Sequence, residues 1–187
     1  VNYSGSTGFG RVYRDRLKQG WGEVDVFDCY ASVMELVNLG EINKDYIAIE
    51  GSSAGGFTAL SCLSKFDIFK VASCRYPVAN LISMNNKTHR FEQSYLDYLL
   101  GPYKENQAKY NNLSPINTVD KINVPVIFFH GLQDDVVDIS QVNSIFDKLI
   151  NKQVPSELYT FDNEAHGFKN SSVNMRVLDL TEKFFKK

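Results

Sequence analysis

The 187-residue chain has few cysteines, no long basic run and no long apolar run. Its three cysteines are odd in number and show no Cys-x-x-Cys or Cys/His spacing, so we expect neither a complete disulfide framework nor a metal site. This usage favours a reducing, cytoplasmic compartment. No run of Lys or Arg exceeds two residues and the net charge is -2, which argues against a nucleic-acid or membrane-surface partner. No apolar run approaches the roughly 18 residues of a membrane span.

The composition is that of an ordinary globular domain. Hydrophobic residues make up 43% of the chain and charged residues 22%, which excludes a disordered or low-complexity protein. No internal repeat and no linker divides the chain, so we expect residues 1–187 to belong to one domain. No cofactor is expected.

Helical and strand patterns alternate along the chain. Apolar residues recur at helical spacing after residue 25, and short apolar, β-branched runs stand between the helical segments. The segment 80–121 is polar and aromatic-rich. The sequence predicts helices at 25–39, 57–63, 139–151 and 172–185, and strands at 46–50, 71–74, 124–129 and 157–161. Such alternation is typical of an α/β fold with a doubly wound, mostly parallel sheet.

One strand, turn and helix carry the pattern of a nucleophile elbow. Gly51-x-Ser53-x-Gly55 lies between the strand 46–50 and the helix 57–63. A serine hydroxyl is a weak nucleophile, and flanking glycines allow the sharp turn that exposes it to a base. We therefore predict that Ser53 is a nucleophile and that the amide of Ala54 faces a developing oxyanion. The alternative is a glycine-rich turn without chemistry.

The base that serves such a serine should be one of three histidines. In α/β-hydrolases the nucleophile, the acid and the histidine follow one another in the chain. His166 follows the last predicted strand and is therefore the predicted base. His130 ends a strand and His89 lies in the polar segment, so both are interpreted as hydrogen-bonded structural histidines.

Three aspartates follow the strand that ends near His130. Asp138 precedes a predicted helix and has Gln141 three residues on, which is the layout of a helix cap. Asp134 leaves the strand first and is predicted to orient the histidine. Asp135 remains an alternative, because the sequence does not determine the geometry of this turn.

Several ordered motifs resemble the prolyl oligopeptidase family. The resemblance extends over nearly the whole chain and, in the segment around residues 88–102, is strongest toward the dipeptidyl and acylaminoacyl peptidase branch. It implies an α/β-hydrolase fold with Ser53, Asp134 and His166 as catalytic triad and Ala54 as oxyanion donor. The motifs are NYSGSTGFG (2–10), WGEVDVFD (21–28), GSSAGG (51–56), HGLQD (130–134) and HGF (166–168).

The resemblance also implies further site residues and some departures. Phe91 and Tyr95 match aromatic walls of the pocket for the residue before the cleaved bond, although core packing would explain them equally well. Some dipeptidyl peptidases place Asn or Arg two residues after the acid, where this chain has Val136. Relatives carry an amino-terminal β-propeller, early strands and a glycine-rich segment that donates to the oxyanion. We expect these to be missing from residues 1–187, which should then have very little activity alone.

These observations predict a serine-type peptidase that hydrolyses short peptides through an acyl-enzyme. A carboxylesterase on the same fold would use the same three residues and prefer activated esters. A catalytically silent interaction domain is a second alternative, against which the complete Ser, Asp and His set speaks. The sequence leaves the oligomeric state open.

Overall fold

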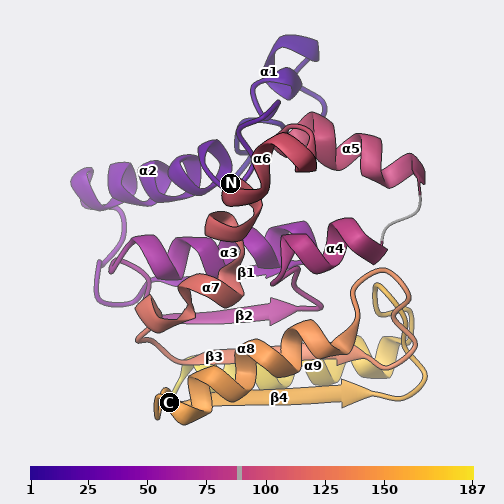
Figure 1. Cartoon of the computed structure of the whole chain (residues 1–187). Helices are drawn as coiled ribbons and strands as arrows, with labels where there is room; N and C mark the ends of the chain where they lie inside the picture. Colours follow the sequence, from indigo (N-terminus) through magenta and orange to yellow (C-terminus); the bar gives the residue numbers. More distant parts are fainter. Residues whose placement is uncertain (88–89) are drawn as a thin grey trace.

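Four parallel strands form one sheet in the order β1-β2-β3-β4 (Figure 1). The structure is a computed structural model that describes the backbone of residues 1–87 and 90–187 and the side chains of residues 1–86 and 94–187. The strands are β1 (Ala48–Ser52), β2 (Val71–Arg75), β3 (Val126–Gly131) and β4 (Ser156–Phe161). All four run in the same direction, so their carboxyl ends meet at one edge of the sheet.

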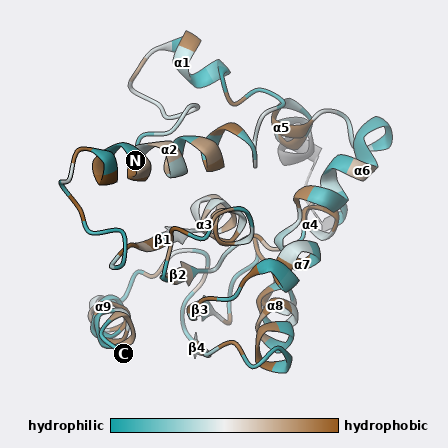
Figure 2. Cartoon of the chain, turned by 90° about the vertical axis from the view of Figure 1, so that its left-hand side faces the viewer, coloured by the Kyte–Doolittle hydropathy of each residue, from teal (hydrophilic) through white to brown (hydrophobic). Residues whose placement is uncertain are grey.

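Helices cover both faces of the sheet. Helix α3 (Ala54–Lys65) and helix α8 (Ile139–Asn151) pack on one face, and α9 (Ser171–Phe185) packs on the other (Figure 2). The side chains of β3 show why, since Val126 and Phe128 join the core under α3 and α8 while Ile127 and Phe129 join the core under α9. A strand buried on both faces reads as a continuous apolar run. The α/β architecture predicted from the sequence is confirmed.

Most predicted elements are present with small changes at their ends. Helix α8 covers 139–151 as predicted, and α2 (Val24–Asn38) differs from the prediction by one residue at each end. The first strand begins at Ala48 rather than at residue 46. The reason is a turn in which the Tyr46 amide donates to Asn43 O at 3.1 Å, so the Tyr46 side chain stays 85% exposed outside the sheet.

The polar segment between β2 and β3 is largely helical. It contains α4 (Leu81–Lys87), α5 (Arg90–Leu100), α6 (Tyr103–Leu113), α7 (Pro115–Thr118) and the 3-10 helix η1 (Val119–Lys121). A short helix α1 (Arg11–Asp15) precedes α2. Leu81, Leu96 and Tyr110 from these helices pack with Trp21 and Phe57 in a second core. This second core lies beside the first turn of α3, where the predicted nucleophile stands.

Strand β1 has one strand neighbour within the described residues, so its other edge presents unpaired backbone groups. Next to that edge a cavity of about 260 Å³ is lined by Val33, Ile49 and Phe69, among others. A row of free N–H and C=O groups beside apolar side chains is a template for pairing with another chain. The free edge therefore predicts self-association when the 187 residues are expressed alone.

The test is light scattering of the isolated 187-residue chain over a range of concentrations. Ala48→Lys places a charge on the exposed end of β1 and should reduce the association, because an edge lysine disfavours strand pairing. Leu39→Lys adds the same charge to an exposed apolar residue outside the sheet and should leave the association unchanged. An unaltered chain that stays monomeric at every concentration would contradict the prediction.

Candidate active site

The structure brings Ser53, His166 and Asp134 together at the carboxyl edge of the sheet. The Ser53 Oγ lies 2.8 Å from His166 Nε2, and the other ring nitrogen, Nδ1, lies 2.8 Å from Asp134 Oδ2. Ser53 follows β1, Asp134 follows β3 and His166 follows β4. Three segments up to 113 residues apart in the chain therefore supply one continuous row of hydrogen-bonding groups.

The turn between β1 and α3 holds Ser53 in a strained conformation. Its φ of 53° lies in the left-handed region, which L-residues other than Asn and Asp adopt rarely. A Cβ atom on Gly51 would lie 2.1 Å from Gly55 O, and one on Gly56 would lie 2.6 Å from the Pro77 Cβ. A Cβ on Gly55 would meet nothing within 4 Å. Glycine is therefore sterically required at Gly51 and Gly56, whereas a Cβ atom at position 55 would meet no other atom.

Ala54 is the first residue of α3. Amides in the first turn of a helix have no intrahelical acceptor, and the helix dipole favours negative charge at this end. The preceding amide, that of Ser53, already donates to Arg75 O at 2.9 Å. Of these two neighbouring amides, only that of Ser53 has an acceptor in the sheet, so the predicted oxyanion role falls to the amide of Ala54.

Asp134 is held by its own loop as well as by His166. Its Oδ1 accepts from the amides of Val136 at 2.9 Å and Val137 at 2.8 Å, and its side chain is 1% exposed. Burial disfavours the charged carboxylate, but the hydrogen bonds from His166 and from these two amides outweigh it, so the pKa of Asp134 lies below its ordinary value. Asp134 is therefore ionised at neutral pH.

The other two aspartates of this loop have different surroundings. Asp135 is exposed, whereas Asp138 caps α8 by accepting from the Ser140 amide at 2.9 Å. Of the three aspartates, the structure places Asp134 against His166.

A buried glutamate, Glu164, holds the loop that carries His166 through hydrogen bonds to its backbone. The carboxylate of Glu164 accepts from the amides of Lys169 at 2.8 Å and Asn170 at 3.0 Å, which closes the loop around the histidine. A Cβ on Gly131 would lie 2.3 Å from Glu164 O, so the end of β3 must be glycine for the two loops to approach each other. The close approach of the histidine loop thus explains why a glycine follows His130 at the end of β3.

Sequence reasoning missed Tyr76. Its ring lies 4.8 Å from the His166 ring and 5.2 Å from the Phe168 ring, measured between centroids. Its φ of 37° is one of four positive values among the described non-glycine residues. Nothing in the sequence around residue 76 signals this placement, because it depends on β2 pairing with β3 and β3 pairing with β4 in the folded sheet.

A cavity of about 320 Å³ opens beside Ser53 and Ala54. Its walls come from the amino-terminal loop, α4, α5 and the turn before α2, and they include Trp21, Val78, Met84, Tyr95, Leu96 and Leu99. Tyr95 lines this cavity and is 58% exposed, and its role in substrate binding stays a prediction. The side chain of Phe91 and all of His89 lie outside the described residues. Trp21 and Val78 were not anticipated as lining residues.

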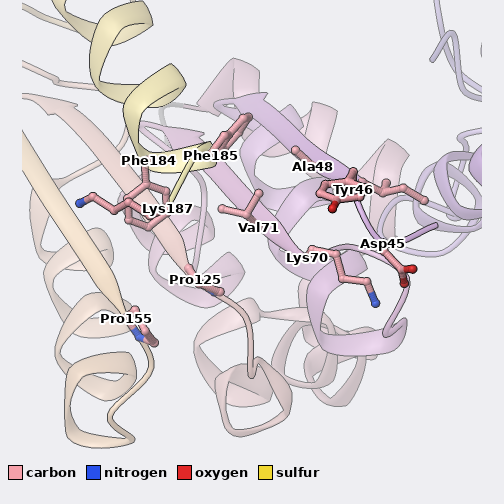
Figure 3. A pocket seen from close by; sticks show the side chains of 11 residues that line it. Asp45, Tyr46, Ala48, Lys70, Val71, Pro125, Pro155, Phe184, Phe185 and Lys187 are labelled. Atoms are coloured by element: carbon pink, nitrogen blue, oxygen red, sulfur yellow. The ribbon is translucent and has the colours of Figure 1, made fainter. Parts of the chain in front are cut away.

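A larger cavity, of about 450 Å³, lies at the opposite ends of the strands (Figure 3). Figure 3 shows Val71, Pro125 and Phe185 around it, with Tyr46 and Lys187 at its margins. Its lining includes none of Ser53, Asp134 and His166. The smaller cavity is the one adjacent to the reactive groups.

Comparison with known proteins is consistent with this arrangement. The whole chain, residues 1–187, matches the prolyl oligopeptidase family of peptidases. The chain belongs to this family. Within the prolyl oligopeptidase family, acylamino-acid-releasing enzyme of Arabidopsis thaliana is 30% identical over 174 residues, which cover 89% of this chain and 23% of the plant protein. Dipeptidyl aminopeptidase BIII of Pseudoxanthomonas mexicana is 26% identical over 98% of this chain and 28% of its own length.

Solved structures show the same fold. A puromycin-hydrolyzing peptidase of Mycobacterium tuberculosis superposes with a TM-score of 0.96 at 38% identity, over 99% of this chain and 28% of that protein. The acylaminoacyl peptidase of Pyrococcus horikoshii superposes with a TM-score of 0.91 at 20% identity, over 100% and 31% of the two chains. The α/β-hydrolase fold is thus shown, and the chain spans about a quarter of the length of its curated relatives. Among the described residues, no helix is both long and apolar enough for a membrane span.

Proposed function

We propose that this chain carries the catalytic centre of a serine peptidase that hydrolyses short peptides of the dipeptidyl or acylaminoacyl type. The observation that supports this most is the unbroken row from Asp134 through His166 to Ser53, with both contacts at 2.8 Å. Serine hydrolases of unrelated folds share this geometry, and each of the three residues has a defined role in it.

The proposed reaction follows from the proton positions. The ionised Asp134 accepts the Nδ1–H of His166, which leaves Nε2 free to accept the Ser53 proton. Ser53 Oγ then attacks the carbonyl carbon, and the Ala54 amide stabilises the negative oxygen. The imidazolium returns the proton to the leaving amine, and an acyl-enzyme remains on Ser53. Water activated by His166 then hydrolyses the acyl-enzyme, which releases the carboxylic acid product and restores the Ser53 hydroxyl.

The cavity beside Ser53 supports a preference for an uncharged, apolar residue before the cleaved bond. None of the described side chains that line it is charged, and Trp21, Leu96 and Leu99 present mostly hydrocarbon. Burying a charged substrate side chain against such walls would cost its hydration without an opposite charge to replace it. Phenylalanine and leucine fit these walls better than aspartate or lysine.

The test of this function is turnover of matched substrates by the intact protein. Aminoacyl and N-acylaminoacyl amides are compared with a simple acyl ester that has no amino acid, and puromycin is a further amide suggested by the relative named above. Efficient cleavage of the amides supports a peptidase. Activity confined to the ester would indicate a carboxylesterase, and failure to react even with a fluorophosphonate would indicate a silent domain.

A charge placed in the cavity should change which substrates are accepted. Met84→Lys puts an ammonium group on its wall and should lower kcat/KM for substrates with Phe or Leu before the cleaved bond by about tenfold to a hundredfold. Substrates with Glu at that position should lose less or gain, because the new cation pairs with them. Met34→Lys is the matched control, since Met34 lines a separate depression next to Lys65. Equal losses on all substrates would contradict the assignment of the cavity.

A further inference from the structure

A second histidine lies directly behind the acid loop. His130 is the fifth residue of β3 and pairs with Thr160 of β4 in the sheet register, and its side chain is fully buried. Its Nε2 lies 3.0 Å from Val137 O and 3.6 Å from Asp134 Oδ2. The ring therefore contacts both the loop that holds the acid and the oxygen of the acid that faces His166.

The contacts determine which ring nitrogen carries the proton. A carbonyl oxygen can only accept, so Nε2 must be the protonated nitrogen that donates to Val137 O. Nδ1 has no partner among the described residues, as fits a ring without a second proton. Burial lowers the pKa of His130, and the nearby His166 ring lowers it further. Asp134, the Val137 hydrogen bond and Asp138 act in the opposite direction but do not outweigh burial. The ring is neutral at neutral pH.

Val137 links His130 to the acid. Its carbonyl accepts from the His130 ring, and its amide donates to Asp134 Oδ1 at 2.8 Å. These two groups lie on either side of the Val137 Cα, so a displacement of Val137 would move a donor away from Asp134. Because the carboxylate has little other freedom, its second oxygen would lose its alignment with His166.

A purely structural histidine would not explain this arrangement fully. One nitrogen of the ring stays bare in the interior, and a buried polar atom without a partner reduces stability. An apolar side chain of similar size would avoid that loss. What it could not do is donate to Val137 O from the sheet.

From these contacts, and resting on the proposed function, we propose that His130 is a positioning residue of the catalytic centre, which fixes Val137 and thereby the orientation of Asp134 toward His166. His130 does not touch the substrate. Its contribution is transmitted through the loop of residues 134–137, and it should act on the chemical step rather than on substrate binding.

The test compares two amide side chains at position 130 in the intact protein. Gln can place an N–H near the position of the imidazole Nε2, whereas Asn is too short to reach Val137 O. We expect His130→Asn to lower kcat roughly tenfold to a hundredfold, as misplacement of catalytic groups by about 1 Å can do, with KM changed less than about twofold. His130→Gln should recover most of the loss.

The matched control is Ser73→Ala. Ser73 is buried on β2, where its hydroxyl lies 3.3 Å from Thr181 Oγ1, so this change also removes a hydrogen bond from the sheet. It should lower the thermal unfolding temperature without lowering kcat. Equal kcat for the Asn and Gln variants, a loss confined to KM, or a parallel loss in the control would overturn the proposal for His130.

A second readout needs no turnover and separates this inference from the proposed function. The Nδ1–H of His166 that is bonded to Asp134 should give a low-field proton resonance. The resonance should broaden or move in His130→Asn and persist in His130→Gln. A resonance unchanged in both variants overturns the positioning role even if the protein proves to hydrolyse nothing, whereas an inactive wild-type protein with the expected resonances would overturn only the peptidase proposal.

Discussion

Ser53→Ala in the intact protein is expected to lower kcat for amide hydrolysis by about five to six orders of magnitude, the size of loss that removal of the serine nucleophile has caused in a well-studied serine protease. The Ser53 oxygen is the atom that stands 2.8 Å from the base, so without it His166 has no hydroxyl to activate. Covalent labelling by a fluorophosphonate should disappear as well. Binding of an unreactive peptide should persist, because the apolar part of the cavity wall, which includes Trp21, Leu96 and Leu99, is unchanged.

The same substitution should leave the fold intact. Alanine has the same backbone demands as serine at a φ of 53°, and the Ser53 amide and carbonyl keep their bonds to Arg75, Phe57 and Val78. Thermal unfolding of the variant should therefore resemble that of the unaltered protein. Ser52→Ala is the neighbouring control and should retain activity. Labelling that moves to Ser52 or Ser61 in the Ser53→Ala protein would refute the assignment.

The elements of the central sheet could be predicted from the sequence because their signals are local. The apolar run before Gly131 and the helical periodicity of 139–151 depend on neighbouring residues alone, and both were placed within two residues of the observed ends. The turn at Ser53 could be predicted for the same reason. Chain order then sufficed to choose His166, because parallel strands deliver their following loops to the same edge.

What the sequence could not predict depends on contacts between distant segments. The helices α4 to α7 are only 4 to 11 residues long, and the core that residues of α4, α5 and α6 form with Trp21 exists only in the folded chain. The contact of Tyr76 with His166 likewise depends on the order of β2, β3 and β4 in the sheet. The interpretation of His130 as a hydrogen-bonded structural histidine agrees with its contact to Val137 O, but it missed that this contact and the approach to Asp134 join it to the acid loop.

The choice between Asp134 and Asp135 also needed the three-dimensional turn. After β3 the chain turns so that the Asp134 amide donates to Gly131 O at 3.2 Å, and this turn directs the Asp134 side chain inward. The next residue then faces solvent. Adjacent residues of like chemistry cannot be distinguished by composition or spacing, only by the turn that separates them.

Asp134→Asn is expected to lower kcat by about three to four orders of magnitude in the intact protein, a loss of the size that the same change has caused in a well-studied serine protease. The structure supplies a specific reason. The amides of Val136 and Val137 both donate to the Oδ1 position, so this position must keep an acceptor, and the oxygen of the asparagine will occupy it. The nitrogen must then stand at the Oδ2 position, 2.8 Å from His166 Nδ1.

An amide nitrogen at that position can only donate. It will donate to His166 Nδ1, which forces the ring proton onto Nε2, and Nε2 can then no longer accept the proton of Ser53. The loss therefore arises from the wrong tautomer rather than from a displaced ring, so KM should change little.

Asp135→Asn should lower kcat by less than about threefold, because that side chain faces solvent. If tautomer trapping is the cause, Asp134→Ala, which has no amide to donate, should be no more damaging than Asp134→Asn. Equal losses for the two asparagine variants, or a greater loss at Asp135, would transfer the orienting role to the neighbouring carboxylate.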